Sequence, residues 1–336
     1  MISSINFIEE QRKQQIGWRK AHISSSEWGW QNKRQYEYII PRDLWKEALW
    51  DGIRTELPSY LTAHDIKPHT GVHNLMSSWI VAANLYFPIR LHSSLKEMMA
   101  EFLRKKLFLA VDEVEQVELE YAMDGEAHPA TLLGETDGGR GVGQTSPDVA
   151  FICRTNGKTL LVLTECKYTE HSFYSCSARA TTGSDKRTAN PNPERCLNAA
   201  GNYDYKEICH QTIWGRKYWD YLNISSKGQG TLKRCPAASA GYQLFRQHAL
   251  AEGILQKKKF DFVASTVSFD CRNDALVKSL RSTGISDFQT EWKEIFDGKV
   301  IFKTWTHQDW VEFVRKNQKV SQWDKWLNYL NDRYGY

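Results

Sequence analysis

Two acidic residues and a lysine, placed where two apolar runs begin and end, are the residues of this chain best suited to catalysis. Asp148 opens one apolar run, and Glu165 and Lys167 close the next. Between the runs lies Asn156-Gly157, a dipeptide typical of a tight β-hairpin. Two antiparallel strands joined there would bring Asp148 close to Glu165 and Lys167. The spacing of two residues also puts Glu165 and Lys167 on one face of their strand.

Such a group of charges favours a bound divalent cation, because two carboxylates converge at high cost unless a cation lies between them. Oxygen ligands favour Mg²⁺ or Mn²⁺ over zinc. We therefore predict Asp148 and Glu165 as metal ligands, with the backbone carbonyl of Cys166 as a third. Lys167 would orient the attacking water or neutralise charge that develops on a phosphate. The alternative is an ion pair at a strand end without catalytic function.

A glycine-rich loop precedes the first of these strands and supplies a further candidate ligand. It spans residues 134–143, and Glu135 is its acid. The loop lacks the Gly-Lys-Ser/Thr ending of a phosphate-binding loop, so it does not predict an ATP site. Glu135 is either an additional metal ligand at the rim of the site or a solvated loop acid.

The motif resembles that of a known superfamily. Pro147-Asp148 with Glu165-Cys166-Lys167 is similar to the signature of the PD-(D/E)XK phosphodiesterases, which share the restriction-endonuclease-like fold. Three other parts of the chain resemble a group of restriction-endonuclease-like proteins within this superfamily: residues 77–88, residues 215–220, and Cys235-Pro236 with Tyr242-Gln243-Leu244. The resemblance implies a metal-dependent nuclease that hydrolyses phosphodiester bonds, of DNA in the first place, with a role in restriction or defence. RNA as substrate and a non-catalytic nucleic-acid-binding module on the same fold are the alternatives.

The resemblance also suggests residues around the metal. Gln211 resembles a glutamine that some members place beside the metal-bound water. Members often add an acid from the helix before the first strand, but the helix expected at residues 71–87 carries none. His73 on that helix could take this place, although a lone histidine is more often structural. The fourth ligand therefore stays open.

Four cysteines follow the motif: Cys176, Cys196, Cys209 and Cys235. No Cys-x-x-Cys is present, so the spacing of a zinc finger is missing. Cys235-Pro236 is nevertheless similar to iron–sulfur ligation, and some nucleases of the superfamily carry a cluster near the same core. We expect either an iron–sulfur cluster or zinc at these four residues, or else free, buried thiols.

The positive charge of the chain is concentrated after the motif. The net charge is +4, and residues 168–235 alone hold ten Lys/Arg against six Asp/Glu. A polyanion would be drawn to this segment, with Arg216 and Lys217 as phosphate contacts. The alternative is a solvated insertion.

Length and composition describe a soluble protein. The chain has 336 residues, of which 41% are hydrophobic, and it has no apolar run long enough for a membrane span. The missing apolar run predicts that the protein has no membrane partner. Its seven cysteines lack the spacing of a disulfide scaffold, which predicts a cytoplasmic location. A homodimer is compatible with this class.

The expected architecture is α/β, a restriction-endonuclease-like core whose mixed central sheet is flanked by helices. A helical, tryptophan-rich N-terminal region (1–68) would precede the nuclease core (69–306). That core would contain a basic, cysteine-containing insertion at about 168–240, and C-terminal helices (307–336) would close the chain. The expected strands are 114–121, 148–153, 159–167, 260–269 and 299–305. Helices are expected at 71–87, where Pro88 would end the helix, and at 93–109 and 205–222.

Overall fold

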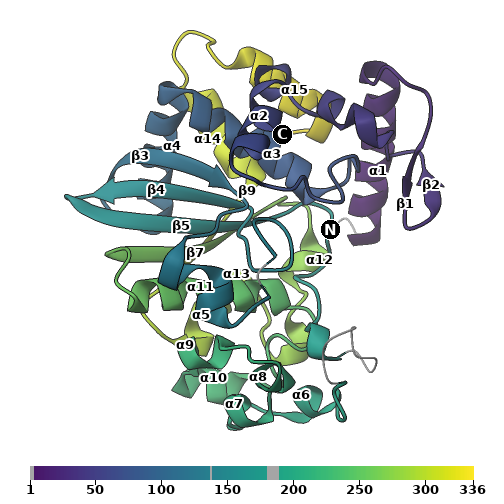
Figure 1. Cartoon of the computed structure of the whole chain (residues 1–336). Helices are drawn as coiled ribbons and strands as arrows, with labels where there is room; N and C mark the ends of the chain where they lie inside the picture. Colours follow the sequence, from purple (N-terminus) through teal and green to yellow (C-terminus); the bar gives the residue numbers. More distant parts are fainter. Residues whose placement is uncertain (1–3, 137, 180–188) are drawn as a thin grey trace.

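A five-stranded mixed sheet crosses the centre of the molecule (Figure 1). The computed structural model describes residues 4–136, 138–179 and 189–336. The strand order is β3-β4-β5-β7-β9, in which β3, β4 and β5 are antiparallel neighbours while β7 and β9 run parallel to β5. The bounds of these strands are β3 Val111–Leu119, β4 Val149–Thr155, β5 Lys158–Lys167, β7 Phe262–Phe269 and β9 Ile301–Thr306. Each of the five expected strands is confirmed, with ends that differ by at most three residues.

The hairpin between β4 and β5 forms where the sequence predicts it. Asn156 and Gly157 have φ angles of 50° and 73°, the left-handed values that a two-residue hairpin turn of this type requires. Thr155 pairs with Lys158 directly across the turn, and the register continues to Val149 opposite Thr164. Asp148 therefore emerges from the sheet beside the end of β5.

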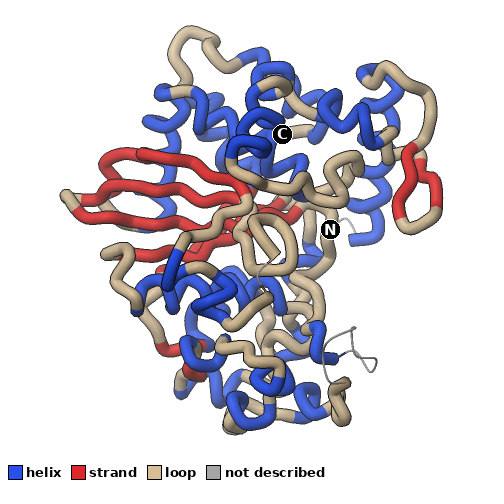
Figure 2. Tube along the Cα trace, in the orientation of Figure 1, coloured by secondary structure: helices blue, strands red, loops and turns tan. Residues whose placement is uncertain are grey.

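Helices cover both faces of the sheet, in two layers that Figures 1 and 2 show above and below it. The upper layer contains α1 (Ser4–His22), α2 (Glu56–Ala63), α3 (Ser78–Leu91), α4 (Ser93–Leu107), α14 (His307–Asn317) and α15 (Asp324–Tyr334). The lower layer contains α5 (Pro129–Leu133), α6 (Arg195–Asn198), α7 (Tyr205–Ile208), α8 (His210–Ile213), α9 (Tyr218–Tyr221), α10 (Ser226–Thr231), α11 (Tyr242–Gln256), α12 (Asp274–Val277) and α13 (Phe288–Ile295). Two-residue and three-residue strands form two small antiparallel sheets, the hairpin of β1 (Gly29–Gln31) with β2 (Arg34–Tyr36) and the pair of β6 (Asn223–Ile224) with the distant β8 (Phe296–Asp297). The short 3₁₀ helices are Arg42–Ala48, Asp51–Ile53, Gly125–Ala127, Ser177–Arg179 and Arg281–Thr283.

Each layer buries its own core against one face of the sheet. On β5 the side chain of Val162 joins the upper core, while Leu161 and Leu163 join the lower one. This alternation places every second side chain on the same face. Glu165 and Lys167 continue the series of Leu161 and Leu163, so both face the lower layer. The upper core joins the two ends of the chain, since the amide of Gln15 in α1 donates to the carbonyl of Arg333 in α15 at 2.8 Å.

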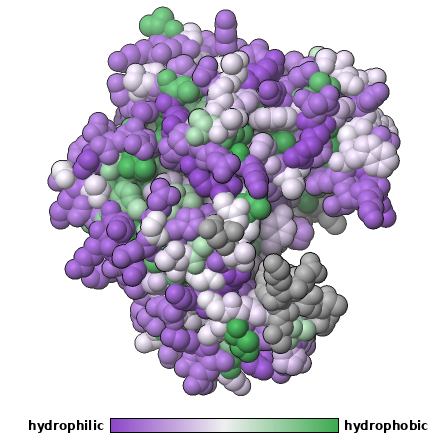
Figure 3. Space-filling model, viewed as in Figure 1, coloured by the Kyte–Doolittle hydropathy of each residue, from purple (hydrophilic) through white to green (hydrophobic). Residues whose placement is uncertain are grey.

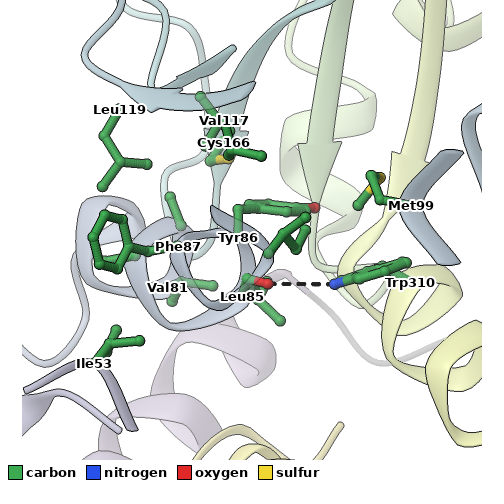
Figure 4. Close-up of a cluster of buried hydrophobic side chains, with 14 of the residues drawn as sticks. Ile53, Val81, Leu85, Tyr86, Phe87, Met99, Val117, Leu119, Cys166 and Trp310 are labelled. Atoms are coloured by element: carbon green, nitrogen blue, oxygen red, sulfur yellow. Dashed lines mark hydrogen bonds between the residues drawn. The ribbon is translucent and has the colours of Figure 1, made fainter. Parts of the chain in front are cut away.

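The prediction that Pro88 ends a helix is wrong, and so is the predicted start of that helix. α3 begins at Ser78 and continues through Pro88 to Leu91. A proline inside a helix lacks an N–H and leaves the carbonyl four residues earlier, here that of Asn84, without its helical donor. The indole of Trp326 in α15 donates to this carbonyl at 2.8 Å. In the upper core that Figure 4 shows, the indole of Trp310 donates in the same way to Leu85 at 3.3 Å.

The single helix expected at 205–222 is also wrong, because the structure divides this segment into α7, α8 and α9. Cys209 has extended backbone angles, φ −74° and ψ 118°, which separate α7 from α8. Gly215 has a φ of 80°, which ends the turn after α8. This segment carries Cys209 and the basic pair Arg216-Lys217, so its breaks decide where these residues lie.

On the face in Figure 3, hydrophobic residues are scattered singly among hydrophilic ones and form no large patch. None of the helices in the described part of the chain has the length and apolarity needed to span a membrane.

Candidate active site

The structure brings Asp148, Glu165 and Lys167 together at the end of the β4–β5 hairpin. The carboxylate of Asp148 accepts a hydrogen bond from the backbone N–H of Cys166 through Oδ2, at 2.7 Å. The ammonium of Lys167 lies 2.5 Å from Oε1 of Glu165, and both side chains are buried, with 3% and 8% exposure. Lys167 also approaches the carbonyl oxygen of Cys166 at 3.4 Å. The convergence predicted from the hairpin is therefore present in the structure.

A third carboxylate, Glu120, lies in the same group and was not predicted from the sequence. It follows β3 directly, has a left-handed φ of 47°, and is 5% exposed. Its N–H donates to the carbonyl of Asp148 at 3.1 Å, which extends the pairing of β3 with β4 by one residue. The left-handed backbone of a buried glutamate is the feature that sets it apart, and no sequence pattern marks it. Gly141 packs against its carboxylate, where a side chain would approach to 3.3 Å.

The three carboxylates repel one another. Burial and then the charge of Glu165 raise the pKa of Glu120 to about 8. Burial and the same charge raise the pKa of Asp148 well above its ordinary value, despite the opposing effect of Lys167. Burial alone would lower the pKa of Lys167, but Glu165 and Asp148 outweigh it and raise that pKa, so the amine stays protonated. The one ammonium of Lys167 thus offsets the charges of Glu165 and Asp148, while Glu120 adds a further acid beside Glu165.

The beginning of α3 borders this group. Trp79 in the first turn of α3 hydrogen-bonds the carboxylate of Glu120 through its side chain. The N–H of Ser78, the first residue of α3, donates to Glu170 at 3.3 Å, and Glu170 also accepts from the N–H of Tyr168 at 2.8 Å. Glu170 lies three residues after Lys167, so a fourth acid borders the site. This short distance from Glu-x-Lys is the signal in the sequence that could have indicated it.

The donors that could hold a divalent cation are oxygen atoms. Oδ2 of Asp148 accepts from Cys166 and Oε1 of Glu165 is held by Lys167, which leaves Oδ1 and Oε2 for a cation. Over the described residues, no three His, Cys, Asp or Glu side chains are grouped closely enough to enclose a metal ion. Mg²⁺ does not require such a cage, because it keeps several waters and binds one or two carboxylates together with phosphates. The donor set therefore fits Mg²⁺ and does not fit zinc.

Glu135 lies apart from this group, in an ion pair of its own. Its oxygens accept from the N–H and hydroxyl of Thr145 and from the hydroxyl of Tyr218 at 2.7 Å. The guanidinium of Arg246 lies 3.0 Å away. Burial would raise the pKa of Glu135, but Arg246 and the hydrogen bonds lower it. Because its oxygens already have these partners, the structure does not place Glu135 as a ligand beside Asp148, and the solvated loop acid is excluded as well.

Gln211 and His73 are likewise placed away from the carboxylates. The amide of Gln211 donates to Ser177 at 3.1 Å, to Tyr242 at 2.8 Å and to the sulfur of Cys176 at 3.3 Å. The ring of His73 is 2.9 Å from the carbonyl of Trp30, within the packing of the N-terminal region. Neither residue is therefore placed beside the carboxylates of Asp148 and Glu165.

Arg216 and Lys217 lie at the border of the lower layer. The guanidinium of Arg216 donates to the carbonyl of Gly134 and, at 3.2 Å, to the hydroxyl of Thr136. Lys217 is exposed. Arg216 thereby connects the basic segment to the glycine-rich loop that leads to Asp148.

The four cysteines after the motif converge in the lower layer. The N–H of Cys235 donates to the carbonyl of Cys196 at 3.0 Å, and the N–H of Cys176 donates to Ala237 at 3.1 Å. All four thiols are free. Burial and then the charges of Cys209, Cys196 and Cys176 raise the pKa of Cys235. Segments that are far apart in the sequence thus bring the four thiols into one region.

A mixed sheet flanked by helices, with an acid before one strand of its hairpin and Glu-x-Lys at the end of the other, defines a restriction-endonuclease-like protein. Residues 10–335, nearly the whole chain, match the family described as Restriction Endonuclease associating with ARP, and the chain belongs to this family. Comparison with curated proteins and with solved structures gives no match.

Proposed function

We propose that this protein is a PD-(D/E)XK nuclease that hydrolyses DNA phosphodiester bonds with Mg²⁺. The observation that carries the proposal is the convergence of Asp148 and Glu165 on the ammonium of Lys167, with Glu120 beside Glu165, at the edge of the sheet where β5 ends. A salt-bridged strand end would pair its charges, whereas burial and then the charge of Glu165 raise the pKa values of Glu120 and Asp148. The family name adds restriction as the biological role and DNA as the substrate.

Each residue has a distinct task in this mechanism. Asp148 is fixed by the Cys166 amide and presents its other oxygen, and Glu165 is held in place by the ammonium of Lys167. Bound Mg²⁺ would supply the polarisation of the scissile phosphate and lower the pKa of the attacking water. Lys167 stays protonated, so it acts by orienting that water or by neutralising charge on the phosphate, and not as a base.

The test is cleavage of supercoiled plasmid and of linear DNA by the purified protein, with Mg²⁺ or with EDTA. We expect cleavage with Mg²⁺ only, and loss of cleavage in Glu165→Gln. Glu126→Gln is the matched control, since Glu126 is exposed on the 3₁₀ helix before α5. If the protein binds DNA but cleaves neither form under any divalent cation, it is a non-catalytic binding module and the proposal fails.

A second cofactor is proposed at the four cysteines. The four thiols Cys176, Cys196, Cys209 and Cys235 lie in one region, where the charges of the first three act on Cys235. We propose an iron–sulfur cluster at these four residues, with zinc as the alternative. Protein purified without oxygen should be brown and contain iron with acid-labile sulfide. Colourless, iron-free protein that remains folded would exclude the cluster.

A further inference from the structure

A pocket of about 230 Å³ lies on the same side of the sheet as the carboxylates. Its lining includes Gln144, Ser177, Arg216, Tyr218, Tyr242 and Arg246. Gln144 is four residues before Asp148, so their Cα atoms are at most about 14 Å apart. Neighbouring nucleotides of a strand whose phosphate lies at Asp148 can therefore reach the pocket.

The amide of Gln144 has no hydrogen-bond partner. Its side chain lines the pocket and is 7% exposed, and neither the nitrogen nor the oxygen of the amide is hydrogen-bonded in the described structure. Burying an amide without partners costs free energy, and proteins usually avoid it. Both amide atoms are shielded from solvent in this structure, so a ligand that offers the complementary pair would bond to them once the amide turns into the pocket.

The surrounding side chains are flat and carry a positive excess. The rings of Tyr218 and Tyr242 meet edge to face at 6.3 Å, and the guanidinium of Arg246 lies 5.2 Å from the ring of Tyr242. Arg246 and Arg216 together outnumber the one acid of the lining, Glu135. Tyr218 is almost fully buried, so the half-buried Tyr242 and Arg246 offer the surfaces on which a nucleobase would stack, and the positive excess tolerates the attached phosphate.

We infer that this pocket receives a nucleobase of the substrate strand, turned out of the helix, and that Gln144 reads its edge. The inference rests on the proposed function, since it takes the substrate to be a nucleic acid. A glutamine amide forms two parallel hydrogen bonds with adenine, which matches a donor and acceptor side by side. Gln144 is thus a specificity-determining residue and takes no part in the hydrolysis.

Binding of single nucleotides to the full-length protein tests this directly. Calorimetric titrations with dAMP, dCMP, dGMP, dTMP and inorganic phosphate would be run in EDTA, so that metal at the carboxylates does not contribute. We expect dAMP to bind about tenfold more tightly than the other three. Gln144→Leu should remove this preference while leaving the melting temperature unchanged or higher, because an unpaired buried amide is replaced by an apolar group of similar size. Gln116→Leu, at an exposed position of β3, should change neither.

Equal binding of all four nucleotides, or phosphate binding as tight as theirs, would overturn the inference. A fall of several degrees in the melting temperature of Gln144→Leu would overturn it too, because the amide would then be structural. The plasmid assay keeps the two proposals apart. Cleavage without nucleotide preference refutes only the pocket, and preference without cleavage refutes only the nuclease.

Discussion

Two buried pairs of a glutamate and a cation lie on the same side of the sheet, and they differ in how completely their charges are satisfied. Glu135 faces Arg246 and also accepts from Thr145 and Tyr218, and its pKa is lowered. Glu165 has Lys167 as its ion-pair partner, while burial and the charge of Glu165 raise the pKa values of the neighbouring Asp148 and Glu120. The first pair is complete without a ligand, and the second has an excess of negative charge.

The difference separates structural ion pairs from functional ones. A buried pair whose remaining oxygens are hydrogen-bonded holds the fold, and breaking it leaves an uncompensated charge. Acids that are held together against their repulsion indicate a functional site, where a bound cation would neutralise their charge and bind a phosphate. The same substitution, glutamate to glutamine, should therefore lower the activity at one pair and the stability of the fold at the other.

The largest effect is expected for Glu165→Gln, on activity. Loss of a metal ligand removes several kcal/mol of transition-state stabilisation, so Mg²⁺-dependent cleavage should fall about a thousandfold or more. Folding should persist, because Asp148 still faces Lys167 and one repelling charge is gone. Initial rates on plasmid, with circular dichroism as the control for folding, measure both. Wild-type rates in this variant would remove Glu165 from the mechanism.

Glu135→Gln should act on stability instead. Arg246 would remain buried without its carboxylate, which costs about 3–5 kcal/mol of unfolding free energy. Urea unfolding of this variant beside the wild type gives the difference, and Glu126→Gln at an exposed position should show none. A decrease below about 1 kcal/mol would mean that the two pairs are alike and that the comparison is mistaken.

Glu120→Gln should change how stability depends on pH. The pKa of Glu120 is about 8 in the folded protein against an ordinary 4.5, so between these values the folded state binds the extra proton. Stability from this group is therefore greatest at low pH and is lost as the pH rises from about 4.5 to about 8. At pH 8 the glutamine variant should be more stable than the wild type by on the order of 1–4 kcal/mol. At pH 4 the two should agree.

Mg²⁺ should offset the loss of stability that the wild-type protein undergoes as the pH rises. Added at pH 8, it should raise the melting temperature, since a ligand that binds only the folded state stabilises it. The rise should be smaller at pH 6, where Glu120 holds a proton, and absent in Asp148→Asn. A rise of equal size in Asp148→Asn would place the cation elsewhere.

The smallest effect is expected at the basic border of the site. Replacing Arg216 and Lys217 by alanine should weaken DNA binding and lower the slope of its salt dependence by about one unit for each phosphate that is no longer neutralised. Fluorescence anisotropy with labelled DNA at several salt concentrations measures the slope. Metal affinity should not change, because neither side chain touches the carboxylates. An unchanged slope would move the phosphate path away from the glycine-rich loop.

Several parts of this protein follow from its sequence alone. The two-residue turn requires positive φ angles, which Asn156 and Gly157 accept more readily than most residues, so this dipeptide favours the hairpin and with it the meeting of Asp148, Glu165 and Lys167. The apolar runs of β4, β5 and β7 determine the buried strands of the sheet. The pair Thr306 and Asp309 has the spacing of a capping box, and it forms that capping box at the start of α14.

Only the tertiary structure decided the rest. Glu120 joined the carboxylates because the end of β3 pairs with residues 147 and 148, a pairing between distant segments that no local pattern encodes. Glu135 and Gln211 lie apart from the carboxylates because each has a partner elsewhere in the structure. Glu135 forms an ion pair with Arg246, and the amide of Gln211 donates to the hydroxyl of Tyr242. α3 continued through Pro88 because the indoles of α14 and α15 bind carbonyl groups around the break. Local residue preferences determine turns and strands, whereas hydrogen bonds between segments far apart in the sequence decide which polar groups meet and which charges stay unsatisfied.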